Sequence, residues 1–116
     1  QRGDTAATIG TFATNGTYTA SDTRLKDNII TITGATEKVK QLRGVTHTWK
    51  ESMQDSDNPN QVSYGLIAQE VESVIPEVVL TDNSEDEYKS VAYQNLIPLL
   101  VETIKELEAR IATLEG

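Results

Sequence analysis

Residues 97–114 read IPLLVETIKELEARIATL, and this stretch decides how the chain is organised. Its large aliphatic residues are separated by 3, 4, 3, 4 and 3 positions, at Ile97, Leu100, Ile104, Leu107, Ile111 and Leu114. In heptad terms Ile occupies each a position and Leu each d position. Such a narrow stripe is typical of a coiled-coil seam, because a helix that packs on its own domain needs a wider apolar face. The sequence therefore predicts a helix over 93–116 that associates with copies of itself.

Two questions about this helix stay open at the level of its own residues. A short amphipathic helix that packs on its own domain is the alternative to the coiled coil. Ile at a with Leu at d favours parallel dimers, but a larger attached domain also influences the symmetry, so two strands and three both remain. Asn95 is the predicted N-cap, which places Pro98 in the first turn, where it costs little.

Short elements alternate in the region before this helix, over residues 21–92. The patterns predict strands at 29–33, 45–49, 64–68, 78–80 and 88–92, and helices at 35–42 and 69–75, the second ended by Pro76. Residues 50–62 are almost entirely polar, which indicates a loop or a projecting hairpin. The expected fold class is α+β, with short strands, small helices and a long C-terminal helix.

The first 20 residues differ in composition from all that follows. They are rich in Thr, Gly and Ala, and Asn15-Gly16 is a strong hairpin-turn dipeptide. We expect the end of an upstream repetitive β-structure at 1–20, a core at 21–92 and the coiled-coil helix at 93–116.

Charge and composition exclude several classes of function. The chain has 116 residues, a net charge of −8 and no cysteine, and residues 51–90 hold most of the acidic excess. An acidic surface repels phosphate backbones, so we expect no nucleic-acid partner, and no apolar run is long enough to suggest a membrane segment. His47 is the lone histidine and no glycine pattern fits a phosphate, so we expect neither a metal ion nor a cofactor.

Ser21 and Lys26 form the one constellation with specific chemistry. A serine with a lysine partner acts as nucleophile and base where burial or a second cation, such as Arg24, lowers the pKa of the amine. Five residues along a strand or a helix place two side chains on different faces. Therefore either a turn lies between Ser21 and Lys26, or Ser21 meets a lysine of a neighbouring copy.

Four blocks of sequence, in this order, carry a family resemblance. They are Ser21-Asp22-x-Arg24-x-Lys26-x-Asn28-Ile29, Tyr64-Gly65-Leu66-Ile67-Ala68-Gln69-Glu70-Val71, Pro76-Glu77-Val78-Val79, and Val91-Ala92-Tyr93 leading into Leu96-Ile97-Pro98-Leu99-Leu100. Together they resemble the intramolecular chaperone auto-processing domain found in phage tailspikes, endosialidases and L-shaped tail fibres. The resemblance covers residues 21–116.

The resemblance implies a homotrimer that guides its upstream fibre segment to fold and then cuts itself off. The cut falls at the Ala20–Ser21 bond, with Ser21 as nucleophile and Lys26 as general base. Asp22, Arg24 and Asn28 match motif positions to which we assign supporting roles. Residues 50–62 match an arm that grips the fibre, with a disordered loop as the alternative.

The same resemblance implies action in the host cytoplasm during phage assembly, with the released domain absent from the mature virion. A trimerisation and folding module that does not cut is the second interpretation. A receptor-binding fibre tip is a distant third, since the sequence shows no sugar-binding cluster.

Overall fold

A computed structural model describes residues 18–116, and the chain divides into two compact units, residues 1–31 and 32–116. Each unit is described by itself. The predicted fibre strands and the Asn15–Gly16 turn lie within residues 1–17, outside the described part. In the first unit the one regular element among the described residues is the 3₁₀ turn η1 (Thr23–Leu25).

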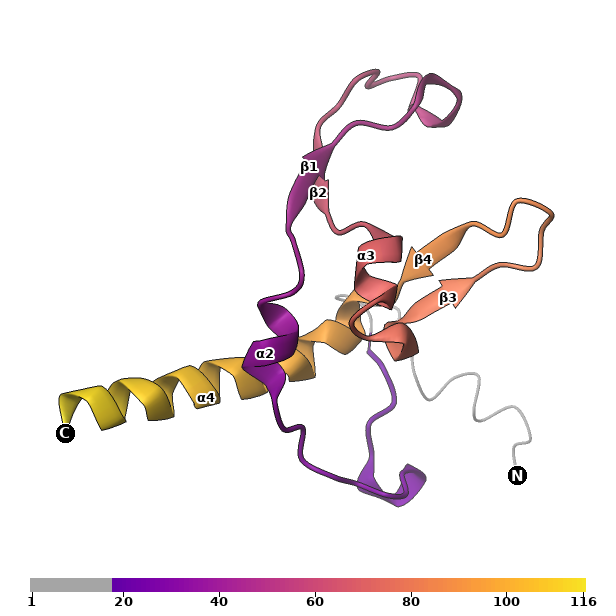
Figure 1. Cartoon of the computed structure of the whole chain (residues 1–116). Coiled ribbons are helices and arrows are strands. Elements are labelled where there is room, and N and C mark those ends of the chain that lie inside the picture. The colour runs from indigo at the N-terminus through magenta and orange to yellow at the C-terminus, as the bar shows by residue number, and fades with distance from the viewer. Residues whose placement is uncertain (1–17) are drawn as a thin grey trace. The chain divides into compact units, whose positions relative to one another are not determined.

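The second unit begins with α2 and ends with the long helix α4 (Figure 1). In chain order its elements are α2 (Ala35–Val39), β1 (Val45–His47), η2 (Glu51–Met53), β2 (Ser63–Gly65), α3 (Ala68–Glu72), η3 (Pro76–Val78), β3 (Val79–Thr81), β4 (Lys89–Val91), η4 (Tyr93–Leu96) and α4 (Ile97–Glu115). The predicted α+β class is confirmed.

Two antiparallel hairpins make up all the sheet structure of the described chain. β1 pairs with β2, with Val45 opposite Gly65, and β3 pairs with β4, with Val79 opposite Val91. The polar residues 50–62 therefore connect two paired strands. Inside this connection the Gln54 side-chain amide donates to the Trp49 carbonyl at 3.1 Å and to Asn60 Oδ1 at 3.0 Å. The hairpin interpretation of this stretch is confirmed.

The core of the second unit is small and lies where α2, α3 and η3 meet the start of α4. Its fully buried apolar residues are Ala35, Val71, Val78, Leu96 and Leu99. Strand and helix residues that are partly buried surround them, including Val39 and Ile75. Val71 and Ile75, both within the segment predicted as a helix at 69–75, contribute to this core.

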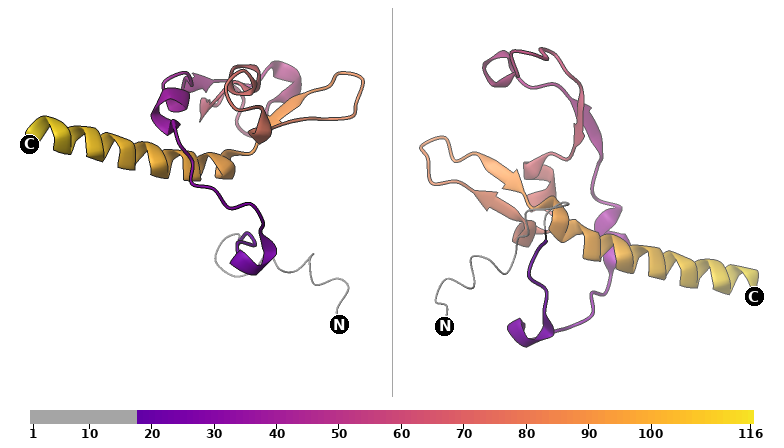
Figure 2. Two further views of the ribbon diagram at one scale, coloured as in Figure 1. Left: turned by 60° about the horizontal axis from the view of Figure 1, so that its bottom comes forward. Right: turned by 180° about the vertical axis from the view of Figure 1, so that it is seen from behind.

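α2 packs against the first half of α4 in both views of the second unit (Figures 1 and 2). Gly34 enters α2 with φ of 67°, a left-handed conformation that glycine adopts without a Cβ penalty. Its successors Ala35 and Thr36 donate their backbone N–H groups to the Glu106 carboxylate at 3.0 and 2.9 Å. The Thr36 hydroxyl adds a third bond to the same carboxylate at 2.6 Å. A side chain of α4 thus supplies the acceptors that the start of α2 lacks locally.

Two expectations were wrong. Residues 29–33 form no strand, because neither hairpin of the described chain offers them a partner. Asn95 is not the N-cap of the long helix, since it lies inside η4, which runs directly into α4. The Ile97 N–H bonds the Gln94 carbonyl, so the 3₁₀ turn η4 satisfies a donor at the start of α4 that a cap would otherwise serve. Pro98 does lie in the first turn of α4, as predicted.

α4 has two distinct faces. Leu99 and Thr103 are buried against the rest of the unit. The predicted a and d residues lie on another face and are 42% to 86% exposed: Ile97, Leu100, Ile104, Leu107, Ile111 and Leu114. The contacts of α4 within its own chain therefore leave the whole heptad stripe uncovered.

Candidate functional site

The turn η1 brings Ser21 and Lys26 together within one chain. The Leu25 N–H bonds the Asp22 carbonyl at 2.9 Å, and the Lys26 N–H bonds the Thr23 carbonyl at 3.2 Å. The chain reverses across these bonds, and Lys26 Nζ lies 2.8 Å from Ser21 Oγ. Of the two arrangements left open by the spacing, the structure shows the intervening turn. Neither a strand nor an α-helix would produce this contact.

Asp22 and Arg24 bond each other across the same turn, with both side chains exposed. Asp22 is the N-cap residue, and its carboxylate accepts the Arg24 backbone N–H at 2.8 Å. The Arg24 guanidinium also forks onto this carboxylate, with Nε at 3.0 Å and Nη2 at 2.8 Å. These bonds hold the pKa of Asp22 below its usual range, the guanidinium first and the backbone N–H second. The ion pair raises the pKa of Arg24 in turn. Arg24 is thus a paired cation, engaged with Asp22.

Asn28 closes the motif with φ of 55°. This left-handed conformation is uncommon for residues with a side chain, and Asn tolerates it better than most. The five motif residues, with Ala20, are all exposed in the single chain. Chemically the arrangement offers a hydroxyl and an amine at hydrogen-bond distance, and the hydroxyl belongs to the residue whose backbone nitrogen is bonded to the Ala20 carbonyl.

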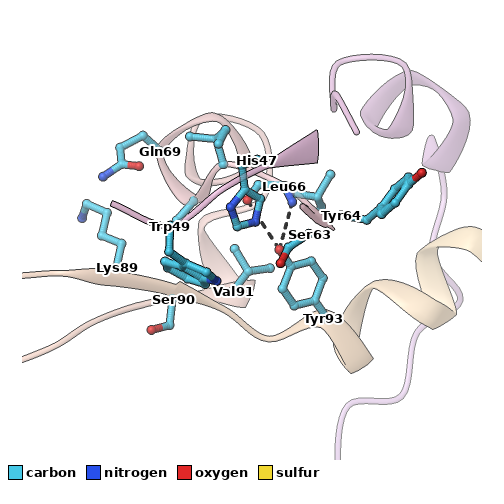
Figure 3. A pocket seen from close by; sticks show the side chains of 12 residues that line it. His47, Trp49, Ser63, Tyr64, Leu66, Gln69, Lys89, Ser90, Val91 and Tyr93 are labelled. Atoms are coloured by element: carbon cyan, nitrogen blue, oxygen red, sulfur yellow. Dashed lines mark hydrogen bonds between the residues drawn. The ribbon is translucent and has the colours of Figure 1, made fainter. Parts of the chain in front are cut away.

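The second unit has a separate cavity of about 570 Å³ between the β1–β2 hairpin, the start of α3 and β4 (Figure 3). His47 and Trp49 meet there edge to face, with ring centroids 5.1 Å apart. The Tyr93 hydroxyl accepts the Leu66 N–H at 2.9 Å and donates to the Leu66 carbonyl at 3.4 Å. Lys89, on the rim, is held by Glu72 at 3.2 Å. Neither Ser21 nor Lys26 lines this cavity.

Sequence reasoning missed two of the contacts that organise the second unit. Glu106 lies off the predicted heptad seam, and Tyr93 enters the sequence analysis only as part of a motif block. Both bond backbone groups far away in the sequence, Glu106 at Ala35 and Thr36 and Tyr93 at Leu66. No local pattern signals either contact, since the partner is a backbone group.

Within residues 18–116, no three His, Asp or Glu side chains gather closely enough to hold a metal ion. In that same described part, no helix combines the length and apolar character needed to cross a membrane.

The chain thus combines a serine–lysine pair in a turn with a small α+β unit that has an exposed heptad stripe. Residues 21–80 match the peptidase family described as the chaperone of endosialidase, a match over more than half of the chain. The chain belongs to this family.

Long tail fibre proteins are the curated relatives. The chain is 36% identical over 101 residues to the long tail fibre protein Gp37 of Enterobacteria phage K3, and equally so to that of Enterobacteria phage T2. It is 32% identical over 90 residues to Gp37 of Escherichia phage AR1. These alignments cover 77% to 85% of this chain but only 7% to 8% of each fibre protein. The chain therefore spans less than a tenth of the length of these relatives.

Proposed function

We propose that this chain is an intramolecular chaperone that trimerises, helps an upstream phage tail fibre segment to fold, and then cuts the Ala20–Ser21 bond. The observation that carries the proposal is the 2.8 Å contact between Ser21 Oγ and Lys26 Nζ, because Ser21 supplies the nitrogen of that bond. Membership of a peptidase family described as a chaperone supports both halves of the function. The likeness to long tail fibre proteins supports a fibre as the folding client.

The position of the two side chains supports the following route for the cut. Ser21 Oγ attacks the Ala20 carbonyl carbon through a five-membered ring, and the Lys26 amine takes the hydroxyl proton. The Ala20–Ser21 C–N bond breaks, Lys26 returns the proton to the leaving amine, and an ester joins Ala20 to Ser21 Oγ. Water then hydrolyses the ester, which releases the Ala20 carboxylate and regenerates the serine hydroxyl with a free amino terminus.

Assembly is the second part of the proposal. The heptad stripe of α4 is uncovered although α2 already packs on another face, so three copies can join through the stripe without disturbing their own cores. Ser21 and Lys26 are exposed in one chain, whereas an acyl-transfer site works best with water excluded. Neighbouring copies that cover the turn would link cutting to correct assembly. The released fibre would then lack its folding guide and be protected kinetically.

The setting of this event is the host cytoplasm during phage assembly, after which the cut domain is absent from the mature virion. Under this proposal the projecting β1–β2 hairpin, with its polar connection 50–62, grips the fibre.

The direct test is to express the chain and weigh its products by intact-mass spectrometry. We expect the wild-type chain to yield residues 1–20 and 21–116, and the Ser21→Ala and Lys26→Ala chains to stay whole. Ser84→Ala and Lys40→Ala, which change exposed residues of the same types outside the turn and outside the connection 50–62, serve as matched controls and should cut normally.

A wild-type chain that assembles but stays whole would leave the second interpretation, a trimerisation and folding module without protease activity. Cutting of the Ser21→Ala chain at the same bond would exclude Ser21 as the nucleophile.

A further inference from the structure

The turn that carries Ser21 and Lys26 is held by two of the other motif residues, Asp22 and Arg24. Ser21 and Lys26 are five positions apart, and their 2.8 Å contact exists only because η1 reverses the chain between them. A 3₁₀ turn of three residues is too short to be stable by its own backbone bonds. Side chains must therefore hold it, and the described contacts show which ones do.

Asp22 holds the turn from two sides. One oxygen of its carboxylate caps the turn by accepting the Arg24 N–H at 2.8 Å. The two oxygens together receive the Arg24 guanidinium in a fork, at 3.0 and 2.8 Å. A bidentate pair fixes direction as well as distance. Both bonds connect residues on either side of Thr23, so they lock the backbone at the point where it reverses.

Asn28 fixes where the chain leaves the turn. Its φ of 55° redirects the backbone two residues after Lys26. A β-branched residue is strongly strained in this conformation, whereas glycine adopts it freely. The position therefore requires a particular backbone shape, which a test can separate from any chemistry of the amide side chain.

We propose that Asp22 and Arg24 are positioning residues that preassemble the Ser21–Lys26 pair within each single chain, before any neighbouring copy arrives, and that Asn28 sets the path of the chain as it leaves the turn. This inference rests on the proposed function, because it assigns the three residues to that site. Under it, assembly covers a pair that already exists, and no neighbour needs to supply the lysine. Arg24 acts through its bond to Asp22, with its charge matched by that carboxylate.

The first test compares cutting rates of the full chain after rapid dilution from denaturant. We expect Asp22→Ala and Arg24→Ala to slow cutting about 100-fold, since a displacement of about 1 Å at a reacting pair has an effect of this size. Asp22→Asn retains an oxygen for the Arg24 N–H but loses the ionic fork, so its rate should lie between those of Asp22→Ala and wild type.

Substitutions of Asn28 separate the effect of its backbone conformation from that of its amide side chain. Asn28→Gly should cut within about 2-fold of wild type, because glycine accepts a positive φ, while Asn28→Thr should lose about 10-fold or more. All these variants should sediment like wild type, since none lies on the α4 stripe. Full-rate cutting by both Asp22→Ala and Arg24→Ala would overturn the inference and leave the proposed function intact.

A readout without cutting separates the two proposals further. In the Ser21→Ala chain, the amide proton of Arg24 should follow the titration of Asp22 with a pKa below the ordinary 3.8. This shift should vanish in a Ser21→Ala, Asp22→Asn chain. If the wild-type chain stays whole but the Arg24 amide titrates in this way, the result supports the proposed turn and contradicts the proposed protease function. If the chemical shift of the Arg24 amide proton does not follow the titration of Asp22, the inferred role of Asp22 in the turn is wrong.

Discussion

The carboxylate of Glu106 joins two helices of the second unit, α4 and α2. It accepts three hydrogen bonds from Ala35 and Thr36, and those bonds lower its pKa to about 2. The Thr36 hydroxyl contributes most to this shift, followed by the Thr36 and Ala35 N–H groups. Glu106 therefore fastens α2 to the long helix only while it is ionised.

We predict that Glu106→Gln lowers the thermal midpoint at neutral pH by roughly 5 °C, because an amide accepts fewer of these bonds. A pKa lowered in the folded state stabilises above the ordinary value of 4.5, and the effect is lost as the pH falls from 4.5 to about 2. Thermal melts from pH 2 to 7 should show the gap between variant and wild type closing over this window.

Glu108→Gln, an exposed glutamate on the same helix, is the matched control and should change little at any pH. A gap for Glu106→Gln that stays constant down to pH 2 would contradict the role of its ionised carboxylate.

The pairing of Ser21 with Lys26 in one chain makes a second residue-level prediction. Co-expressed Ser21→Ala and Lys26→Ala chains should form mixed trimers in which neither chain is cut, because each lacks one half of its own pair. Intact mass and gel bands measure this. Tagged wild-type chains mixed with either variant control for assembly, and they should still cut. Cutting of the Lys26→Ala chain in mixed trimers would show that a neighbour supplies the lysine.

At the level of elements, the junction between β2, α3 and η4 depends on one hydroxyl. Tyr93 bonds both backbone groups of Leu66, and a Cβ added at Gly65 would lie 2.9 Å from the same hydroxyl. Because the hydroxyl is pinned by Leu66, it cannot move aside without losing its bonds. Gly65 thus leaves room for Tyr93 to join these elements.

We predict that Gly65→Ala and Tyr93→Phe each destabilise the chain, the second by about 1 kcal/mol. Their effects should not add, because Tyr93→Phe removes the atom that the new methyl group would meet. Urea unfolding of the two single variants and the double variant measures the coupling. Strictly additive effects would show that the steric contact is unimportant.

The segment 29–33 shows why one predicted strand does not form. Ile29, Ile30 and Ile32 with two threonines have high β-propensity, yet this propensity mostly reflects packing against a neighbouring strand. The described chain provides no such neighbour. The hairpins at 45–65 and 79–91 were largely predictable, because each pairs with a partner close in sequence.

For the whole molecule, the uncovered stripe on α4 is the feature that bears on assembly. Its six apolar residues lie outside the chain's own core, so their exposure is a property of the single chain. The core itself contains only a few fully buried apolar residues. Association through the stripe would bury additional apolar surface and stabilise the chain together with its neighbours.

We predict that Ile104→Asp abolishes trimer formation while the single chain keeps its helical content, because Ile104 is 66% exposed and makes no part of the core. Sedimentation at micromolar concentration and far-UV circular dichroism measure the two properties. Ala109→Asp, away from the stripe on the same helix, should remain assembled. A wild-type chain that sediments as a monomer would contradict the assembly proposal.

The same Ile104→Asp chain should also stay uncut if neighbouring copies complete the site. Its Ser21–Lys26 pair lies far away in sequence and is unchanged. Normal cutting by a monomeric Ile104→Asp chain would separate protease activity from assembly.

The sequence by itself determined the long helix, its 3.5-residue stripe, the order of short strands and helices, and the motif that marks the family. These are periodic or contiguous features, so they can be read without knowing distant contacts. Only the tertiary structure decided that the stripe stays uncovered, that Glu106 fastens α2, and that Ser21 meets Lys26 across a turn. Those outcomes depend on side-chain directions and on contacts between residues far apart in the sequence. A residue type does not reveal that the backbone N–H of Ala35 needs an acceptor or that the chain reverses at Thr23.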